Sequence, residues 1–468
     1  MIYENIEITD AGSEGMAVGK IGDKIIFVPF VVPGDVVDVQ LIKKKKRYLE
    51  GKAIQIREYS PKRTAPHCDH FGLCGGCRWQ NMKYEEQLFY KQKQVFDSLT
   101  RIGKLVNPLI LPIIPAPETT FYRNKLDFTF SNHRWLTDDD KNNEKGSADT
   151  HALGFHIPQF FDKVVDIQYC YHQKDPSNAI RNEVRKYARE HRLSFYDVRI
   201  WQGLLRNLII RNTNAGGLMV IMVFRNDDPE NELLLNFIAS RFPEITSLYY
   251  VINPKKNDTT YDLAFNLFKG ESFITEIMPP FMPGGKVIKF RIGPSSFFQT
   301  NSQQAIQLYR IAAGFASFSG NEHVYDLYTG TGTIANYIAP YVKKVTGVES
   351  VAAAISDAEI NSQINGIFNA EFFAGEVEKL MTPQFIEDRG RPDIVITDPP
   401  RNGMHEKVVR TLLNVKPARI VYVSCNPATQ ARDLALMSDI YLMEKCQPVD
   451  MFPHTQHVEN VALLKLRD

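Results

Sequence analysis

Two short apolar runs near the carboxyl end of the chain constrain its fold most. One reads IVIT and ends before Asp398, and the other reads IVYV and ends before Ser424. Uninterrupted apolar runs of this length are typical of strands buried on both faces of a parallel sheet. Pro399, Pro400 and Pro427 cannot continue a central strand, so a polar loop must follow each run.

These two loops predict a functional site. The first begins at Asp398 and the second places Cys425 directly after its strand. In an open α/β sheet, ligands bind outside the carboxyl ends of the strands, so this carboxylate and this thiol are expected to face one pocket. A strand-ending turn with a buried cysteine is the alternative for either loop alone. Two such loops in succession favour the site.

A strand, a glycine turn and a helix precede these loops. The sequence HVYDLYTGTGTIANYIA carries Gly330 and Gly332 in the turn, and the next predicted strand ends at Glu349. Such a turn lets the backbone approach a ligand, and the acidic residue can accept hydrogen bonds from ribose hydroxyls. A dinucleotide fingerprint would need glycine where Ala335 stands. The pattern therefore predicts a Rossmann-like domain over 283–468 that binds a mononucleoside cofactor.

Length and composition bound the rest. A chain of 468 residues predicts two to four domains. The net charge of +1 excludes a generally basic protein, so a nucleic-acid partner would be held by local patches. We expect a cytoplasmic protein with no membrane span, because no signal peptide or long apolar run is present. Six cysteines are too few for a secreted disulfide scaffold of this length.

The first segment, 1–61, predicts a small β-barrel. It contains short alternating strands separated by Gly-Asp and Pro-Gly-Asp turns. The basic run from Lys43 to Arg47 lies between two of these strands and is followed by Tyr48. Such a loop can bind phosphates while the aromatic ring stacks on a base, although a solvated hairpin tip has the same composition.

A cysteine cluster opens the β-rich central segment, 62–282. Cys68, Cys74 and Cys77 form a C-x5-C-x2-C pattern, and Cys170 is the best candidate for a fourth ligand. Four thiolates fit either a tetrahedral zinc ion or a [4Fe–4S] cluster, and the spacing does not separate the two. The pattern is not the C-x3-C-x2-C of enzymes that cleave S-adenosylmethionine by radical chemistry.

The last motif of interest is HTQHVEN. Its His454, His457 and Glu459 have spacing that suggests a metal site, but a predicted strand follows at once and no fourth ligand is near. We favour the alternative, in which Glu459 is a base at the start of a strand.

Taken together, the motifs resemble the S-adenosylmethionine-dependent RNA uracil-C5 methyltransferases over essentially the whole chain. They comprise a barrel like the TRAM domain, the cysteine cluster with its distant fourth member, and the sequences FFQTN, DLYTGTG, TDPPRNG, SCNP and HVEN. The resemblance implies that Cys425 is the nucleophile and Glu459 the proton acceptor. It implies a cofactor site made by Gln299, Tyr328, Glu349 and Asp398, and a [4Fe–4S] cluster on Cys68, Cys74, Cys77 and Cys170. It further implies an RNA substrate, with 23S ribosomal RNA favoured over transfer RNA. We also expect a monomer.

The chemistry requires these residue types independently. Carbon 5 of uracil is a weak nucleophile, so a thiolate must first add at carbon 6, and a base must later remove the carbon-5 proton. RNA cytosine-C5 methyltransferases carry a second cysteine in the loop at Asp398, which this chain lacks. Adenine-N6 methylation needs an Asp-Pro-Pro-Tyr-like loop, whereas Arg401 stands here. A non-catalytic RNA-binding protein would not need the set of Gln299, Glu349, Cys425 and Glu459.

Overall fold

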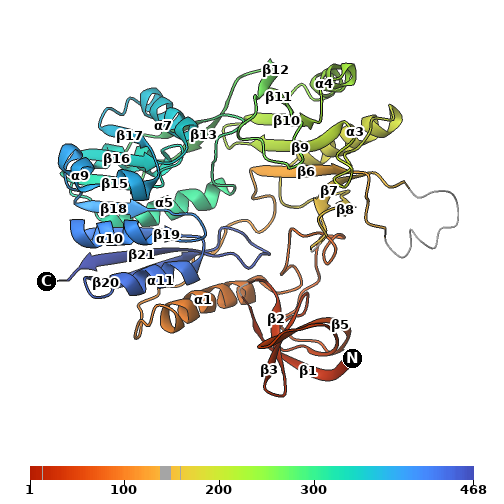
Figure 1. The fold of residues 1–468 in the computed structure, drawn as a ribbon, viewed down its shortest axis with the longest axis horizontal. Helices are drawn as coiled ribbons and strands as arrows, with labels where there is room; N and C mark the ends of the chain where they lie inside the picture. The colour runs from red at the N-terminus through yellow and green to blue at the C-terminus, as the bar shows by residue number, and fades with distance from the viewer. Residues whose placement is uncertain (13, 137–148, 159, 468) are drawn as a thin grey trace.

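The computed structural model describes residues 1–12, 14–136, 149–158 and 160–467. They form a closed five-stranded barrel, two seven-stranded sheets and a two-stranded hairpin (Figure 1). The predicted mixed α/β fold with an N-terminal barrel is confirmed. Within the described ranges no helix is both long and apolar enough to cross a bilayer.

The barrel is built from the first five strands, in the order β1-β2-β3-β5-β4, and β1 closes it by pairing with β4. Its strands are β1 (Ile2–Ala11), β2 (Ala17–Ile21), β3 (Lys24–Val28), β4 (Val36–Lys44) and β5 (Tyr48–Glu58). Ile8, Ile26 and Val39 lie fully buried in its core. The basic run covers the last two residues of β4 and the turn to β5, and its side chains are exposed. Closure removes the unpaired edges that a five-stranded sheet would otherwise present.

The central sheet has the order β12-β11-β10-β9-β6-β7-β8. Its strands are β6 (Lys125–Ser131), β7 (Ala152–His156), β8 (Val164–Asp166), β9 (Leu205–Asn212), β10 (Leu218–Phe224), β11 (Ser247–Ile252) and β12 (Asn266–Gly270). Two helices, α3 (Ser177–Glu190) and α4 (Pro229–Arg241), contact each other and contribute to the same apolar core as the sheet. The predicted β-rich character of this segment is observed.

The C-terminal sheet has the order β17-β16-β15-β18-β19-β21-β20. Its strands are β15 (His323–Leu327), β16 (Lys344–Glu349), β17 (Ala370–Ala374), β18 (Ile394–Thr397), β19 (Arg419–Ser424), β20 (Tyr441–Val449) and β21 (Glu459–Leu466). The first five run parallel, and β21 runs antiparallel between β19 and β20. β16 and β17 lie on one side of β15, and β18, which follows β17 in the chain, lies on the other. The strand order therefore reverses between β15 and β18, and ligands bind at the carboxyl ends of strands at such a point.

Helices flank this sheet (Figure 1). They are α5 (Ser302–Ala316), α6 (Thr333–Ile338), the short 3-10 helix η1 (Ala339–Tyr341), α7 (Ala352–Asn365), α8 (Val377–Leu380), α9 (Pro383–Arg389), α10 (Glu406–Val415) and α11 (Pro427–Met437). Asn301 caps α5, because its side chain accepts a hydrogen bond from the backbone N–H of Gln304. This cap fixes the start of α5 directly after the FFQTN segment.

Helix α1 (Tyr84–Arg101) packs on α11 and β20, although it lies in sequence next to the cysteine cluster. Lys91 of this helix and Asp450 form a fully buried ion pair with a 2.6 Å separation. The segment after α1 runs beside β20 through bridges at Ile110 and Ile114, so it covers that edge of the sheet. The predicted boundary at 282/283 falls inside the hairpin of β13 (Ile274–Met278) and β14 (Ile288–Ile292). The domain boundaries stay predictions.

Candidate active site and cysteine cavity

A small cavity of about 40 Å³ opens at the carboxyl end of β15. Its lining includes four of the six residues predicted to bind the cofactor, namely Gln299, Tyr328, Gly330 and Asp398. The other lining residues are Phe297, Phe298, Tyr309, Asp326, Thr329, Thr331, Thr333 and Ile334. Gly332 and Glu349 do not line the cavity. Gly332 is part of the turn after β15, and Glu349 accepts a hydrogen bond from that turn.

The turn after β15 depends on left-handed backbone. Tyr328, Gly330 and Gly332 have φ angles of 63°, 56° and 72°. A Cβ at Gly332 would lie 2.8 Å from both Asn336 Nδ2 and Ala358 Cβ, so that position requires glycine. The Gly330 N–H donates to Glu349 Oε2 over 3.2 Å, and the Val351 N–H donates to Oε1 over 3.0 Å. These two bonds hold the Glu349 carboxylate at the end of β16, beside the turn.

Two carboxyl groups meet in this cavity. Asp326 is 1% exposed, and its Oδ2 accepts from Thr329 Oγ1 over 2.5 Å and from the Ala335 N–H over 3.0 Å. Its Oδ1 has no hydrogen-bond partner among the described residues. Burial raises the pKa of Asp326 to about 7. Burial, together with the charge of Asp326, also raises the pKa of Asp398 to about 7. A bound cation would therefore stabilise the ionised form of both carboxyl groups.

Asp326 was missed by the sequence interpretation. It lies inside the strand β15, where a run of buried residues hides its role. The available signal was an acidic residue in an otherwise apolar strand, four residues before Gly330. A buried carboxylate needs a partner or a ligand, so its position alone could have indicated the site.

Cys425 and Glu459 come together because of strand register. Cys425 follows β19, Glu459 begins β21, and the antiparallel pairing of these strands sets Ser424 opposite Asn460. Burial, followed by the charges of Glu459 and Asp398, raises the pKa of Cys425 to about 11, and Arg401 opposes the shift. Burial and the charge of Asp398 raise the pKa of Glu459 to about 8, again against Arg401. The thiol, the two carboxyl groups and the guanidinium thus share one electrostatic environment.

The two site loops are also bonded to each other. The backbone oxygen of Arg401 accepts hydrogen bonds from Asn426 Nδ2 and from Thr429 Oγ1, each over 3.1 Å. Asn426 in turn caps α11 by accepting from the Ala428 N–H. The position of Cys425 is therefore fixed by a helix cap on one side and by the loop after Asp398 on the other.

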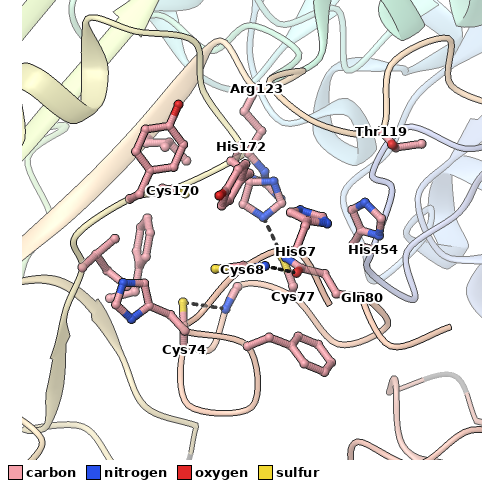
Figure 2. Close-up of a pocket in the computed structure, with 18 residues that line it drawn as sticks. His67, Cys68, Cys74, Cys77, Gln80, Thr119, Arg123, Cys170, His172 and His454 are labelled. Carbon is pink, nitrogen blue, oxygen red and sulfur yellow. Dashed lines mark hydrogen bonds between the residues drawn. The ribbon is translucent and has the colours of Figure 1, made fainter. Parts of the chain in front are cut away.

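The four cysteines of the predicted cluster line a second cavity, of about 120 Å³ (Figure 2). Cys68, Cys74 and Cys77 come from the loop before α1, and Cys170 follows β8. Cys77 Sγ lies 3.0 Å from His172 Nε2, and the Gly76 N–H donates to Cys74 Sγ over 3.4 Å. In the described part of the chain, no three or more His, Cys, Asp or Glu residues are placed to hold a single metal ion.

This donor set fits a soft metal centre better than a hard one. Burial raises the pKa of Cys74 and of Cys77 to about 12, so both remain thiols unless a metal displaces their protons. A tetrahedral zinc site would hold its thiolates only about 3.8 Å apart, as follows from Zn–S bonds of about 2.3 Å. Four cysteines that line one cavity supply the soft donors used by both zinc sites and iron–sulfur clusters.

The cysteine loop is connected to the segment that leads to Glu459. The backbone oxygen of His454 accepts from the N–H groups of Arg78 and Trp79, over 2.9 and 3.0 Å. His454 also lines the cysteine cavity. His454 and His457 form no metal group with Glu459 among the described residues, and the role of Glu459 as a base stays a prediction. No sequence pattern indicated His172, which approaches Cys77 from a distant segment.

The comparisons with known proteins agree with this geometry. The family model described as tRNA (Uracil-5-)-methyltransferase matches residues 269–467, and the TRAM domain model matches residues 3–54. A protein of Bacteroides thetaiotaomicron described as an uncharacterized RNA methyltransferase is 54% identical over 459 residues, which cover 97% of this chain and 100% of the relative. A protein of Porphyromonas gingivalis with the same description is 51% identical over 467 residues, which cover 98% and 99%.

This chain belongs to the tRNA (uracil-5-)-methyltransferase family. The family consists of S-adenosylmethionine-dependent RNA methyltransferases, and the chain is an enzyme of that class. The solved structure of the Pyrococcus abyssi tRNA (uracil-54, C5)-methyltransferase in complex with S-adenosyl-L-homocysteine matches with a TM-score of 0.73 and 29% identity. That match covers 99% of this chain and 100% of the archaeal one, so the family fold extends over barrel, central sheet and C-terminal sheet alike.

Proposed function

We propose that this enzyme transfers a methyl group from S-adenosylmethionine to carbon 5 of a specific uridine in RNA. The observation that carries the proposal is the meeting of Cys425 and Glu459 beside the cavity that contains Asp398. A soft nucleophile and a base on opposite sides of one pyrimidine ring are what C5 methylation of uracil requires. The six free cysteines fit a reducing compartment, so we further propose a cytoplasmic location.

In this mechanism Cys425 starts the reaction. Its sulfur forms a bond to carbon 6 of the uracil, and the electron pair of the 5,6 double bond moves toward carbon 5 and the carbonyl at carbon 4. The thiol must lose its proton first, and burial raises its pKa to about 11, so an ionised form needs electrostatic help. Arg401 supplies a positive charge that lowers this pKa. When bound, S-adenosylmethionine would supply the electrophilic methyl group for carbon 5, and S-adenosyl-L-homocysteine would leave with the electron pair of the broken sulfur–methyl bond.

Glu459 completes the reaction. As a carboxylate, it accepts the proton from carbon 5, the resulting electron pair restores the 5,6 double bond, and the bond from carbon 6 to the Cys425 sulfur breaks. A base with a pKa of about 8 is close enough to neutrality both to accept and to release this proton. Gln299, Tyr328, Gly330, Gly332, Glu349 and Asp398 are the residues we propose for binding the methyl donor.

The target uridine must leave its base stack to reach the thiol, because carbon 6 is not accessible within a helix. We propose that the barrel holds the RNA through the basic run from Lys43 to Arg47. Its exposed side chains and the half-buried Tyr48 support this role.

We propose that Cys68, Cys74, Cys77 and Cys170 hold a [4Fe–4S] cluster, with zinc as the alternative. The cavity that all four cysteines line supports a centre with soft thiolate ligands there. When bound, it would supply a structural cross-link between the loop before α1 and the segment after β8, since methyl transfer moves no net electrons. Protein purified without oxygen should contain about four iron atoms and matching sulfide. Stoichiometric zinc without sulfide would select the alternative.

The experiment that tests the activity uses Cys425→Ala and Cys425→Ser. Both variants should bind S-adenosylmethionine as the wild type does but transfer no detectable methyl group to RNA from a strain that lacks the gene. Methyl transfer by Cys425→Ala at a wild-type rate would remove this residue from the nucleophile role.

We propose 23S ribosomal RNA as the substrate, because the bacterial family members with a cysteine cluster, which this chain resembles, commonly act on ribosomal RNA. Transfer RNA is the second candidate, because the P. abyssi relative is a tRNA (uracil-54, C5)-methyltransferase. Mass spectrometry of nucleosides from both RNA pools of a deletion strain should show 5-methyluridine missing from 23S ribosomal RNA. Its loss from transfer RNA alone would assign the second substrate.

A further inference from the structure

We propose that an aromatic and basic surface at the outer end of the central sheet binds an unpaired segment of the substrate RNA. This aromatic–basic surface consists of Trp201, Lys255, Lys256 and Tyr261. It deepens the proposed function and rests on RNA being the substrate. It lies far from the candidate active site, so it would act on substrate binding and not on the chemistry.

Each aromatic ring of this surface is exposed and has the ammonium group of a lysine over its face. Trp201 is 42% exposed and Tyr261 is 82% exposed. The Nζ of Lys256 lies 3.6 Å from the centroid of the Trp201 ring, and the Nζ of Lys255 lies 5.7 Å from that of Tyr261. Proteins that bind single-stranded RNA combine aromatic faces for base stacking with positive charge for the backbone. One face of the indole contacts Lys256, and its exposure leaves area for a base.

A buried arginine holds the loop that carries both lysines. Arg206, 1% exposed, donates from Nη1 to the backbone oxygens of Asn253 and Lys255, and from Nη2 to that of Asn257 over 2.9 Å. Its Nη2 also donates to Asp258 Oδ1 over 2.8 Å. A surface loop fixed by an internal guanidinium keeps its conformation before a ligand arrives. Such preorganisation lowers the entropy cost of binding.

The turn that presents Trp201 is strained. Trp201 has a φ of 59°, in the left-handed region that bulky residues rarely adopt. Its N–H donates to the Asp197 oxygen over 2.7 Å, and its own oxygen accepts from Arg225 Nε over 3.4 Å. Gly203 closes the turn, because a Cβ there would lie 2.3 Å from the Phe195 oxygen. Strain of this kind persists where the surroundings impose it, commonly at binding sites.

The charges favour RNA over a protein partner. Lys255 pairs with Asp262 over 2.5 Å, whereas Lys256 has no ion pair within the described ranges and is available to a phosphate. Arg225 adds a further positive charge beside Trp201.

The surface is separated from the active site by the length of the central sheet. Arg211, at the other end of β9, donates to the Gly293 oxygen of the C-terminal region. Arg206 lies five residues before it, which corresponds to roughly 17 Å along a strand. An RNA with its target base at Cys425 must therefore extend across the central sheet to reach Trp201.

The test measures binding of a fluorescein-labelled twelve-nucleotide oligouridine by fluorescence anisotropy. Trp201→Ala and Tyr261→Ala should each raise the Kd about 5- to 150-fold, the range for losing one base stack. Trp201→Phe should retain most of the affinity, because a ring remains. Lys256→Ala should reduce the slope of log affinity against log salt by about 0.7. Phe368→Ala is the matched control, since Phe368 is an aromatic residue 93% exposed after α7.

The proposal is overturned if Trp201→Ala and Tyr261→Ala bind the oligouridine as the wild type does, or if Phe368→Ala weakens binding equally. All variants should keep the wild-type affinity for S-adenosylmethionine, which reports that they are folded. Normal methylation of RNA with unchanged binding by both aromatic variants would remove this surface and leave the proposed function intact. Weaker binding by these variants, together with a wild-type enzyme that methylates no uridine, would keep the RNA-binding surface and reject the proposed function.

Discussion

The raised pKa values of the candidate cofactor cavity predict how methyl-donor binding depends on pH. Burial raises the pKa of Asp326 and of Asp398 to about 7 in the ligand-free enzyme. A sulfonium cation beside them would lower both values, because it stabilises the ionised form. Binding of S-adenosylmethionine should therefore release protons near neutral pH. Its affinity should rise as the pH rises from about 6 to about 8.

The magnitude follows from the titration of one carboxyl group. A group with a pKa of about 7 is ionised in about one tenth of the molecules at pH 6 and in about nine tenths at pH 8. If only the ionised form binds the cation well, the affinity rises about tenfold, or about 1.4 kcal/mol. The charge of Asp326 also raises the pKa of Asp398. Each carboxyl group that binding ionises should release about half a proton per ligand at pH 7.

Isothermal titration calorimetry at three pH values, in buffers of different ionisation enthalpy, measures both the affinity and the protons released. S-adenosyl-L-homocysteine is the matched ligand, because it lacks only the methyl group and its positive charge. Its affinity should change much less with pH. Asp398→Asn should flatten the profile for S-adenosylmethionine, whereas Glu387→Gln, an exposed carboxyl on α9, should not. Parallel profiles for the two ligands would refute the reasoning.

Two further predictions concern the thiol and the buried ion pair. RNA containing 5-fluorouridine should form a covalent adduct with wild-type enzyme but not with Cys425→Ala. The adduct persists because the base can remove a proton, but not fluorine, from carbon 5. A denaturing gel without a shifted band would count against thiol addition. Lys91→Met should lower the free energy of unfolding by about 3–5 kcal/mol, because it leaves Asp450 buried without its cation; chemical denaturation that gives a loss below about 1 kcal/mol would contradict this, and Lys93→Met, a half-exposed neighbour, is the control.

Much of the fold was predictable because local patterns report burial. The apolar runs before Asp398 and Cys425, the glycine turn at Gly330 and the alternating strands of 1–61 each indicated an element that the structure contains. No sequence pattern indicated the packing of helix α1 on α11 and β20. That docking depends on the buried pair of Lys91 and Asp450, which are separated by 359 residues. No local pattern reports such a contact.

The sequence by itself determined which groups are available for chemistry. They are the Cys425 thiol and the Asp398 carboxylate, which each follow a buried strand, Glu349 at the end of β16, and the four cysteines of the cluster. Only the tertiary structure decided which of them meet. The antiparallel insertion of β21 beside β19 brings Glu459 to Cys425, and the burial of Asp326 next to Asp398 gives the cavity its charge. The reason is physical. Residue type fixes the chemistry of a side chain, whereas its pKa and its neighbours depend on the dielectric and packing created by distant segments.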